Sequence, residues 1–167
     1  MKDYLGLIDV NTPGRRNDVT PLFADAAAFS ELIKDLAAPF EPAKIDRVAG
    51  IDALGFILAT AIAVHFGKGL VPIRKGGKLP VQVDRQEFID YTGESKSLEL
   101  RSGSLQPGTR VLLVDEWIET GAQIQSAIKL IERQGGIVVG IAAINIDLNE
   151  KTRSILEKYP CHTVWVE

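Results

Sequence analysis

The sequence predicts an α/β fold in which a central parallel sheet is flanked by helices. Short strands are expected at residues 47–51, 70–73, 111–114 and 137–144. The runs at 111–114 and 137–144 are apolar and rich in β-branched residues, as in strands that are covered on both faces. Helical segments separate them, and the short joints around the first such helix imply a right-handed parallel crossover. With 167 residues, 46% hydrophobic and 25% charged, the chain fits one domain spanning residues 1–167.

The first part of the chain is expected to form an irregular lead-in and two helices. Residues 11–22 are rich in turn formers and contain a Thr-Pro pair that favours a helix start. From Asp25, a plausible N-cap, apolar residues recur at intervals of three and four, as on a core-facing helix. The next helix, at residues 56–66, is apolar nearly all round, so we expect it to be buried between layers.

The middle of the chain is expected to contain a long flexible loop. Residues 82–97 are polar and weakly patterned, and a connection of this length is a candidate mobile lid. Strand character resumes at residues 98–100. Near the end of the chain, a short helix at residues 151–158 and a last strand at 162–166 complete the expected fold.

The segment from Arg110 to Gly136 reads as a buried strand, an acidic loop and an amphipathic helix. Asp115 and Glu116 follow the strand at its carboxyl end, where ligands bind in open α/β sheets. The helix opens at residues 120–123, Thr-Gly-Ala-Gln, and Gly135 is expected to end it in a left-handed conformation. Because the first amides of a helix lack internal partners, this arrangement can hold a phosphate. The glycine at 121 lets the backbone come close to it.

This segment also has other interpretations. Acidic residues after a strand can simply solvate an ordinary crossover loop. The run VLLVDE is similar to a Walker B strand, but the chain has no G-x-x-x-x-G-K-[ST], and no G-x-G-x-x-G follows a strand. Mononucleotide P-loop and dinucleotide sites are therefore disfavoured.

Composition narrows the function classes further. A net charge of −3 argues against a nucleic-acid surface, which needs a basic field. The single cysteine, Cys161, excludes an intramolecular disulfide and suits a reducing compartment. We expect no signal peptide, because the first ten residues are acidic and have too short an apolar stretch. The apolar helix is shorter than the roughly 20 residues that span a bilayer. We expect a cytoplasmic protein without membrane contact.

A second candidate anion site follows the strand at residues 70–73. Arg74, Lys75 and Lys78 surround the two glycines at 76 and 77. Three cations around two glycines, directly after a strand, are suited to clamp a polyanion. The alternative is a solvated basic turn.

These motifs resemble a known family. The strand and loop VLLVDEWIETGAQ is similar to the ribose-phosphate signature of type I phosphoribosyltransferases. The stretches VAGIDALGF, LVPIRKGGKLP, LELRSGSLQPG and DVTPLFADAAAF resemble segments of adenine phosphoribosyltransferases, in the same order and at similar spacing. The resemblance covers most of the chain.

The resemblance implies transfer of ribose 5-phosphate from 5-phosphoribosyl-1-pyrophosphate (PRPP) to a purine. It implies that Mg²⁺ is carried on the oxygens of PRPP and that the protein itself has no metal site. It also implies a homodimer, and a small hood formed by about residues 1–22 and 150–167. Residues implied in the PRPP ribose and 5-phosphate site are Asp115, Glu116, Glu119, Thr120, Gly121, Ala122 and Gln123. Arg74, Lys75 and Lys78 are implied at the pyrophosphate, Arg16 and Asn17 at the base, and Asp90 and Tyr91 in the catalytic flexible loop.

Four positions depart from the family pattern. Leu54 stands where Arg is usual, and Arg16-Asn17-Asp18 stands where Phe-Arg-Asp is usual. Gln123 replaces a Thr of the phosphate turn, and Glu119 replaces a small residue. Glu119 matches an acidic residue that faces the purine ring in 6-oxopurine phosphoribosyltransferases, which suggests a catalytic role; the alternative is a solvent-facing residue at a helix start.

The sequence is therefore compatible with three functions. The first is an adenine phosphoribosyltransferase, which the overall resemblance favours. The second is an enzyme for a 6-oxopurine, favoured by Glu119 and the altered lead-in. The third is a non-catalytic protein that binds PRPP or a nucleotide, favoured by Leu54 and Gln123.

Overall fold

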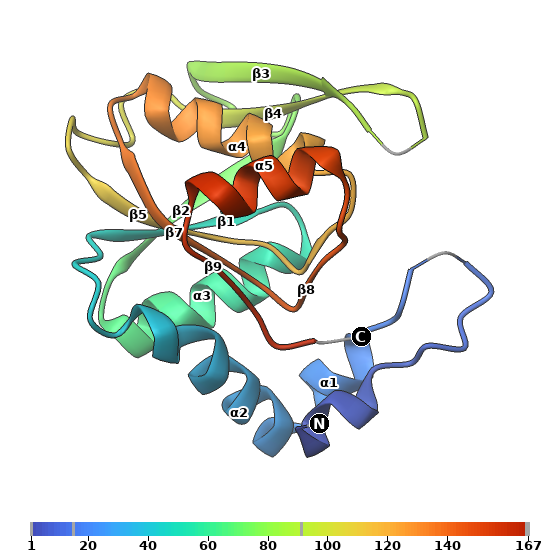
Figure 1. Ribbon diagram of the computed structural model, residues 1–167. Coiled ribbons are helices and arrows are strands. Elements are labelled where there is room, and N and C mark those ends of the chain that lie inside the picture. The colour runs from blue at the N-terminus through green and yellow to red at the C-terminus, as the bar shows by residue number, and fades with distance from the viewer. Residues whose placement is uncertain (1, 15, 91, 166–167) are drawn as a thin grey trace.

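The computed structural model describes residues 2–14, 16–90 and 92–165 (Figure 1). Its helices are η1 (Asp3–Leu7), α1 (Thr20–Ala24), α2 (Ala26–Ala37), η2 (Ala38–Phe40), α3 (Leu54–Phe66), α4 (Ala122–Arg133) and α5 (Glu150–Lys158). Its strands are β1 (Arg47–Ile51), β2 (Gly69–Lys75), β3 (Val83–Ile89), β4 (Ser95–Arg101), β5 (Arg110–Val114), β6 (Trp117–Ile118), β7 (Ile137–Ala143), β8 (Asn145–Ile146) and β9 (Cys161–Thr163).

Seven strands form one sheet in the order β3-β4-β2-β1-β5-β7-β9. From β2 to β9 all neighbours are parallel, whereas β4 runs antiparallel to both β2 and β3. The short strands β6 and β8 form a separate parallel pair. The predicted α/β class, with a mostly parallel central sheet, is confirmed.

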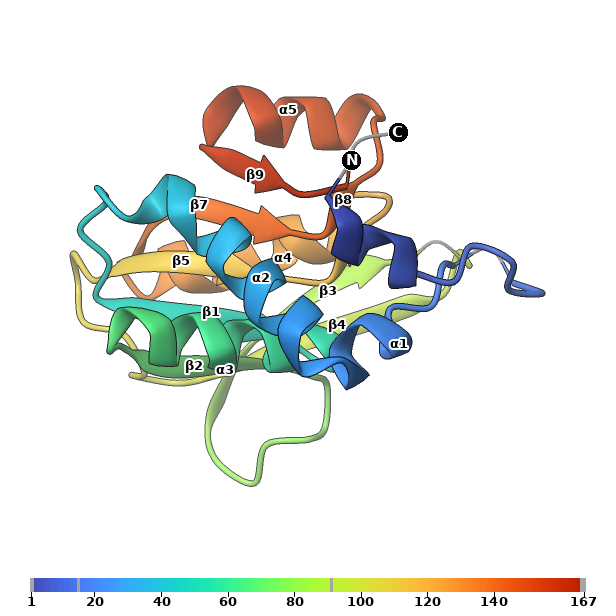
Figure 2. The same ribbon diagram turned by 90° about the horizontal axis from the view of Figure 1, so that it is seen from below.

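Helices cover both faces of this sheet. In Figures 1 and 2, α2 and α3 lie on one face and α4 lies on the other. Two apolar clusters match these layers: one joins Leu36 and Leu58 to β1 and β5, and the other joins Ile124 and Ile131 of α4 to the opposite face. Parallel strands covered on both sides need apolar residues at successive positions, which explains their continuous apolar runs.

Helix α3 differs from the prediction. It begins at Leu54, not at residue 56, and it is not enclosed between layers. Leu58 and Ile62 are fully buried, but Ile57 and Val64 are 42% and 77% exposed. The helix is thus apolar on its outer face as well as on its core face. The structure describes no helix that is both long enough and apolar enough to cross a membrane.

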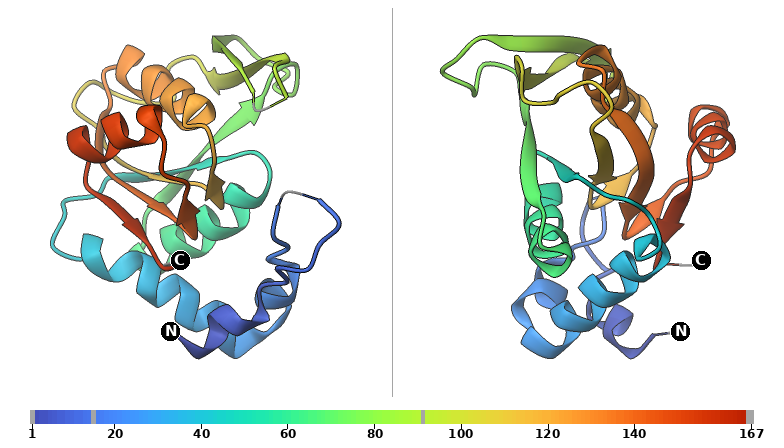
Figure 3. Two further views of the ribbon diagram at one scale, coloured as in Figure 1. Left: turned by 45° about the vertical axis from the view of Figure 1, so that its right-hand side comes forward. Right: turned by 90° about the vertical axis from the view of Figure 1, so that its left-hand side faces the viewer.

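The segment predicted as an unstructured loop, residues 82–97, is mostly a β-hairpin, and this prediction was wrong. Strands β3 and β4 pair in antiparallel register from Val83 and Arg101 to Ile89 and Ser95, and the hairpin projects over α4 (Figure 3). Its base is fixed to α4 by polar contacts. Arg133 donates to the carbonyl oxygen of Arg85 at 2.9 Å, and Gln134 donates to Asp84 at 2.6 Å. The mobility of the hairpin tip stays a prediction.

The two ends of the chain pack partly together. Tyr4, Leu5 and Ile8 share the apolar cluster of α2 and α3 with Val164, so the lead-in and the last described residues meet beside the sheet. Helix α5 instead packs on the side of α4, where Ile155 joins the opposite cluster. The described residues of this predicted hood segment, 150–165, therefore divide between two sides of the molecule.

Candidate functional site

A cavity of about 770 Å³ lies at the carboxyl ends of the central strands. Residues from four separate parts of the chain line it, among them Arg16 of the lead-in, Lys75 at the end of β2, Asp90 at the hairpin tip, and Asp115, Glu119 and Gln123 of the segment after β5. The fold therefore brings most of the predicted site residues to one place.

The predicted phosphate turn lies at the start of α4. Gly121 is the N-cap and has a φ of 80°, and the backbone N–H of Ala122 donates to the hydroxyl oxygen of Thr120 at 3.3 Å. Thr120, Gly121 and Gln123 line the cavity. The next amides of the helix lie at the positive end of its dipole, so this turn can bind an anion.

Glycine is required at position 121 because the turn packs closely against α5 on the side that faces away from the cavity. A Cβ atom at this position would lie 3.2 Å from Cγ2 of Thr152 and 3.3 Å from Cβ of Lys151. The φ of 80° also lies in the left-handed region, which side-chain-bearing residues rarely adopt. Helix α5 thus supports the turn from behind, and only glycine allows both the conformation and this close approach.

Asp115 lies directly after β5 and is only 6% exposed. Its Oδ1 accepts from the backbone N–H of Glu116 at 2.9 Å, and its Oδ2 accepts from Nε2 of Gln123 at 3.1 Å. Burial raises the pKa of Asp115 to about 7, although these hydrogen bonds act in the opposite direction. Burial also raises the pKa of Glu116, while the charge of Arg16 lowers it. The acidic pair is partly desolvated and ready to accept hydrogen bonds.

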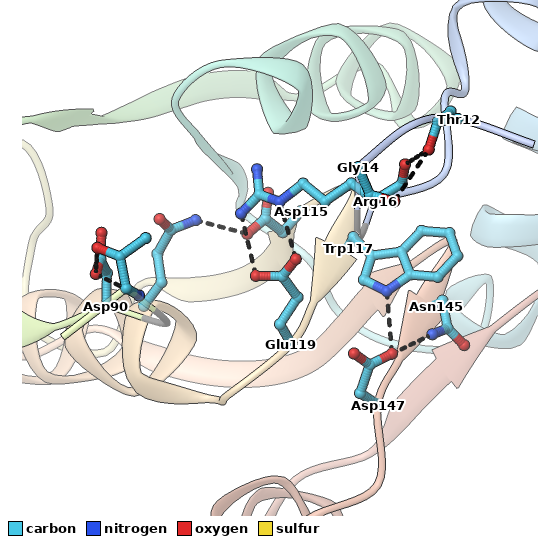
Figure 4. A network of polar contacts seen from close by, with 11 residues as sticks. Thr12, Gly14, Arg16, Asp90, Asp115, Trp117, Glu119, Asn145 and Asp147 are labelled. Atoms are coloured by element: carbon cyan, nitrogen blue, oxygen red, sulfur yellow. Dashed lines mark hydrogen bonds and ion pairs between the residues drawn. The ribbon is translucent and has the colours of Figure 1, made fainter. Parts of the chain in front are cut away.

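Arg16 and Glu119 form a two-point ion pair across the cavity (Figure 4). Nε of Arg16 lies 2.8 Å from Oε1 of Glu119, and Nη2 lies 3.1 Å from Oε2. The two residues are 103 positions apart in sequence. Both replace residues usual in the resembled family, but nothing in the sequence indicated that they would be in contact. Asn17, predicted beside the base, is not among the residues that line the cavity.

Gln123 does not direct its side chain into the phosphate turn. Its carboxamide instead donates to Asp115. Any phosphate contact of residue 123 must therefore come from its backbone amide in this arrangement.

The basic turn is only partly inside the site. Lys75 and Gly76 line the cavity, but Arg74 and Lys78 are not among its lining residues. Nε of Arg74 lies 3.5 Å from Oδ2 of Asp52. Leu54, where the family pattern has Arg, packs against the apolar cluster of α2 and α3. Of the predicted pyrophosphate residues, Lys75 is therefore the best placed.

A buried carboxylate, Glu99, stabilises the basic turn at residues 74–78. Glu99 of β4 pairs with Arg85 of the neighbouring strand at 2.5 Å. The backbone N–H of Gly77 holds the pKa of Glu99 below its ordinary value, with burial opposing it and Arg85 assisting. This fixes the position of the turn relative to the hairpin.

Asp90 lies at the hairpin tip and closes its turn. Its Oδ1 accepts from the backbone N–H and the hydroxyl of Thr92, at 2.8 and 2.6 Å. These bonds, led by the hydroxyl of Thr92, lower the pKa of Asp90. Tyr91, the other predicted catalytic residue of this segment, lies outside the described residues. The catalytic roles of both stay predictions.

The sequence reasoning missed a group of supporting residues behind the acidic loop. Asp147 accepts from Nε1 of Trp117 at 3.0 Å and from Nδ2 of Asn145 at 2.7 Å (Figure 4). Asn149, the N-cap of α5, donates to the carbonyl oxygen of Glu119 at 2.7 Å. The residue type of Asn149 is compatible with a helix N-cap, but the sequence does not indicate its contact with a loop thirty residues away.

Fold and site together define a class of protein. A parallel α/β sheet carries at its carboxyl edge an acidic pair, a helix N-terminus suited to phosphate and a lysine across the cavity. Such a site can bind a sugar phosphate through its hydroxyls and its phosphate at the same time.

The chain belongs to the phosphoribosyl transferase domain family, whose model matches residues 22–162. It is similar to an adenine phosphoribosyltransferase of Dinoroseobacter shibae, with 45% identity over 84% of this chain and 78% of the relative. A second such relative, from Roseiflexus, is 38% identical over 91% of this chain and 88% of its own length.

Solved structures agree with this assignment. The adenine phosphoribosyltransferase of Rhodothermus marinus matches with a TM-score of 0.84 at 34% identity, covering 96% of this chain and 94% of that one. The enzyme of Saccharomyces cerevisiae, solved in complex with an imino-altritol bisphosphate and adenine, matches with a TM-score of 0.81 at 26% identity. It covers 96% of this chain and 97% of that one.

Proposed function

We propose that this chain is an adenine phosphoribosyltransferase, which transfers ribose 5-phosphate from PRPP to adenine and releases AMP and pyrophosphate. Family membership and the names of the relatives support the reaction. The structural observation that carries the proposal is the cavity that Asp115, the turn at residues 120–123 and Lys75 share.

Each group has a distinct task in the proposed reaction. Asp115 and Glu116 accept hydrogen bonds from the ribose hydroxyls, and the amides of residues 120–123 hold the 5-phosphate. As the bond to pyrophosphate breaks, positive charge develops on the ribose and negative charge on the leaving group. Lys75 faces the leaving group and stabilises its charge, while the buried Asp115 and the half-buried Glu116 stabilise the sugar.

The proposal includes Mg²⁺ as part of the substrate. Mg²⁺ prefers oxygen ligands and is commonly held through substrate phosphates. As the complex with PRPP it neutralises charge on pyrophosphate, which adds to the effect of Lys75. Magnesium dependence, a role in purine salvage and a cytoplasmic location all remain predictions.

A homodimer also remains a prediction. The outer face of α3 supplies an apolar surface for it, because Ile57 and Val64 are seven residues apart and lie on the same face of the helix. A contiguous apolar patch on this face would suit a subunit interface.

One observation favours a second candidate, transfer to a 6-oxopurine. The pair of Arg16 and Glu119 lines the cavity, and a guanidinium donates well to the O6 and N7 edge of such a base. A carboxylate accepts from a ring N–H. The base preference therefore depends on whether Arg16 and Glu119 separate and contact the base instead of each other.

Pyrophosphate release with a panel of bases tests the proposed function. The protein is incubated with Mg²⁺, PRPP and either adenine, hypoxanthine, guanine or no base. We expect release that depends on both Mg²⁺ and base and is fastest with adenine. Faster release with hypoxanthine or guanine would favour the second candidate. If the protein binds PRPP but releases no pyrophosphate in a base-dependent way, the result would favour a non-catalytic nucleotide-binding protein.

A further inference from the structure

Gln123 and Asp115 form a contact that the family pattern does not predict. Gln123 lies in the first turn of α4, and its Nε2 donates to Oδ2 of Asp115 at 3.1 Å. Both residues line the cavity. The threonine usual at this position is shorter by two heavy atoms along the side chain, so Gln123 can reach a partner that lies beyond the phosphate turn.

We infer that Gln123 is a positioning residue, which orients the carboxylate of Asp115 toward the ribose hydroxyls of the substrate. This inference rests on the proposed function, because it assigns Asp115 to the sugar. Glutamine at this position thus serves the ribose site, and the backbone amides alone serve the 5-phosphate.

The carboxylate is held at both oxygens. The backbone N–H of Glu116 occupies one site on Oδ1, and Gln123 occupies one site on Oδ2. An ionised carboxylate has about four acceptor sites, so each oxygen keeps one for a ribose hydroxyl. With donors on both oxygens, rotation of the carboxylate is restricted.

The first turn of α3 restricts Asp115 from another side. A Cβ atom at Gly55 would lie 2.9 Å from Oδ1 of Asp115, so only glycine leaves room for the carboxylate there. The three residues of that turn, Leu54-Gly55-Phe56, contribute no titratable group. Charges act on Asp115 from Glu116 on its own loop and from Arg16 of the lead-in.

The hydrogen bond also affects the charge of Asp115. Burial raises its pKa to about 7, and the bond from Gln123 lowers it. Removing this donor therefore raises the pKa further, and a larger fraction of Asp115 is protonated at neutral pH. A protonated carboxyl group has lost part of its acceptor capacity for ribose hydroxyls, so affinity should fall most at neutral and lower pH.

Gln123→Leu tests the inference, because leucine fills similar space without a donor. Gln125→Leu is the matched control: it makes the same change on the same helix, at a residue that does not line the cavity. Calorimetry measures the affinity of each protein for AMP from pH 6.5 to 9. The titration of the AMP phosphate is common to all proteins and cancels in the ratio of affinities.

We expect Gln123→Leu to weaken AMP binding by about ten-fold at pH 7, the size of one hydrogen bond to a charged group, and to regain only part of this loss at pH 9, where Asp115 is ionised but no longer oriented. Gln125→Leu should follow the wild type throughout. Equal affinities of wild type and Gln123→Leu, or a loss that is the same at every pH, would overturn the positioning role. A wild-type protein that does not bind AMP would overturn the proposed function itself.

Discussion

Replacing Gly121 by valine is expected to abolish measurable binding of PRPP. The left-handed φ of 80° at this position costs a residue with a side chain about 1–3 kcal/mol, and valine is among the least suited residues. Its Cβ would also press on Thr152 and Lys151 of α5. Relief of either strain moves the turn at residues 120–123, and its amides then no longer converge on the phosphate. We expect a loss of at least about 100-fold in affinity by calorimetry.

Gly67→Val is a matched control for this change. Gly67 also has a left-handed φ, of 61°, but a Cβ atom there would meet no heavy atom within 4 Å. It ends α3, while the other end of that helix contacts Asp115. This variant should lose thermal stability and keep its affinity for PRPP. If Gly121→Val is folded and binds PRPP like the parent protein, the phosphate site is misplaced.

Replacing Glu119 by alanine is expected to lower turnover by roughly 10²- to 10⁴-fold, the range of a general base. Glu119 faces the cavity from the acidic loop, where Arg16 holds it. The loss should be seen with whichever purine the protein uses. Affinity for PRPP should be kept or improved, because a carboxylate beside the bound phosphate repels it.

Arg16→Ala and the double variant Arg16→Ala/Glu119→Ala distinguish a structural role of this ion pair from a joint action on the base. An exposed ion pair with only a structural role is worth about 0–1 kcal/mol, so each variant would then keep most of its turnover. If the pair acts as a unit on the base, the double variant should lose little more than Glu119→Ala alone. Glu41→Ala, which breaks an exposed pair with His65, is the control. Unchanged turnover in Glu119→Ala would leave its ion pair with Arg16 as a structural contact only.

The strands of the parallel sheet could be predicted from the sequence because burial on both faces makes them continuous apolar runs. The boundaries of β1, Arg47–Ile51, agree with the prediction. The hairpin was missed for the opposite reason. Strand β3 packs against α4 through Arg133 and Gln134, so it carries few of the apolar residues that mark a strand. An all-apolar helix, in turn, does not reveal that Ile57 and Val64 are on its exposed side.

The positions of the acidic loop and of the start of α4 could also be predicted, because their residues are consecutive and follow a strand. Contacts between distant segments could not. The pair of Arg16 and Glu119 and the bond from Asn149 to the loop depend on how the lead-in and α5 pack, and no periodicity encodes such packing. Gln123 illustrates the same limit at short range, since its identity was noted but the direction of its side chain was not.

Binding of the 5-phosphate by the turn at residues 120–123 is tested most directly by the response of individual backbone amides to ribose 5-phosphate. In ¹⁵N-labelled protein, we predict that the amide signals of Gly121 and Gln123 shift most, because their N–H groups meet the phosphate. A second cavity, lined by Phe40, Val139 and His162 among others, provides an internal comparison. Largest shifts around Val139 and His162, with Gly121 unmoved, would contradict the account.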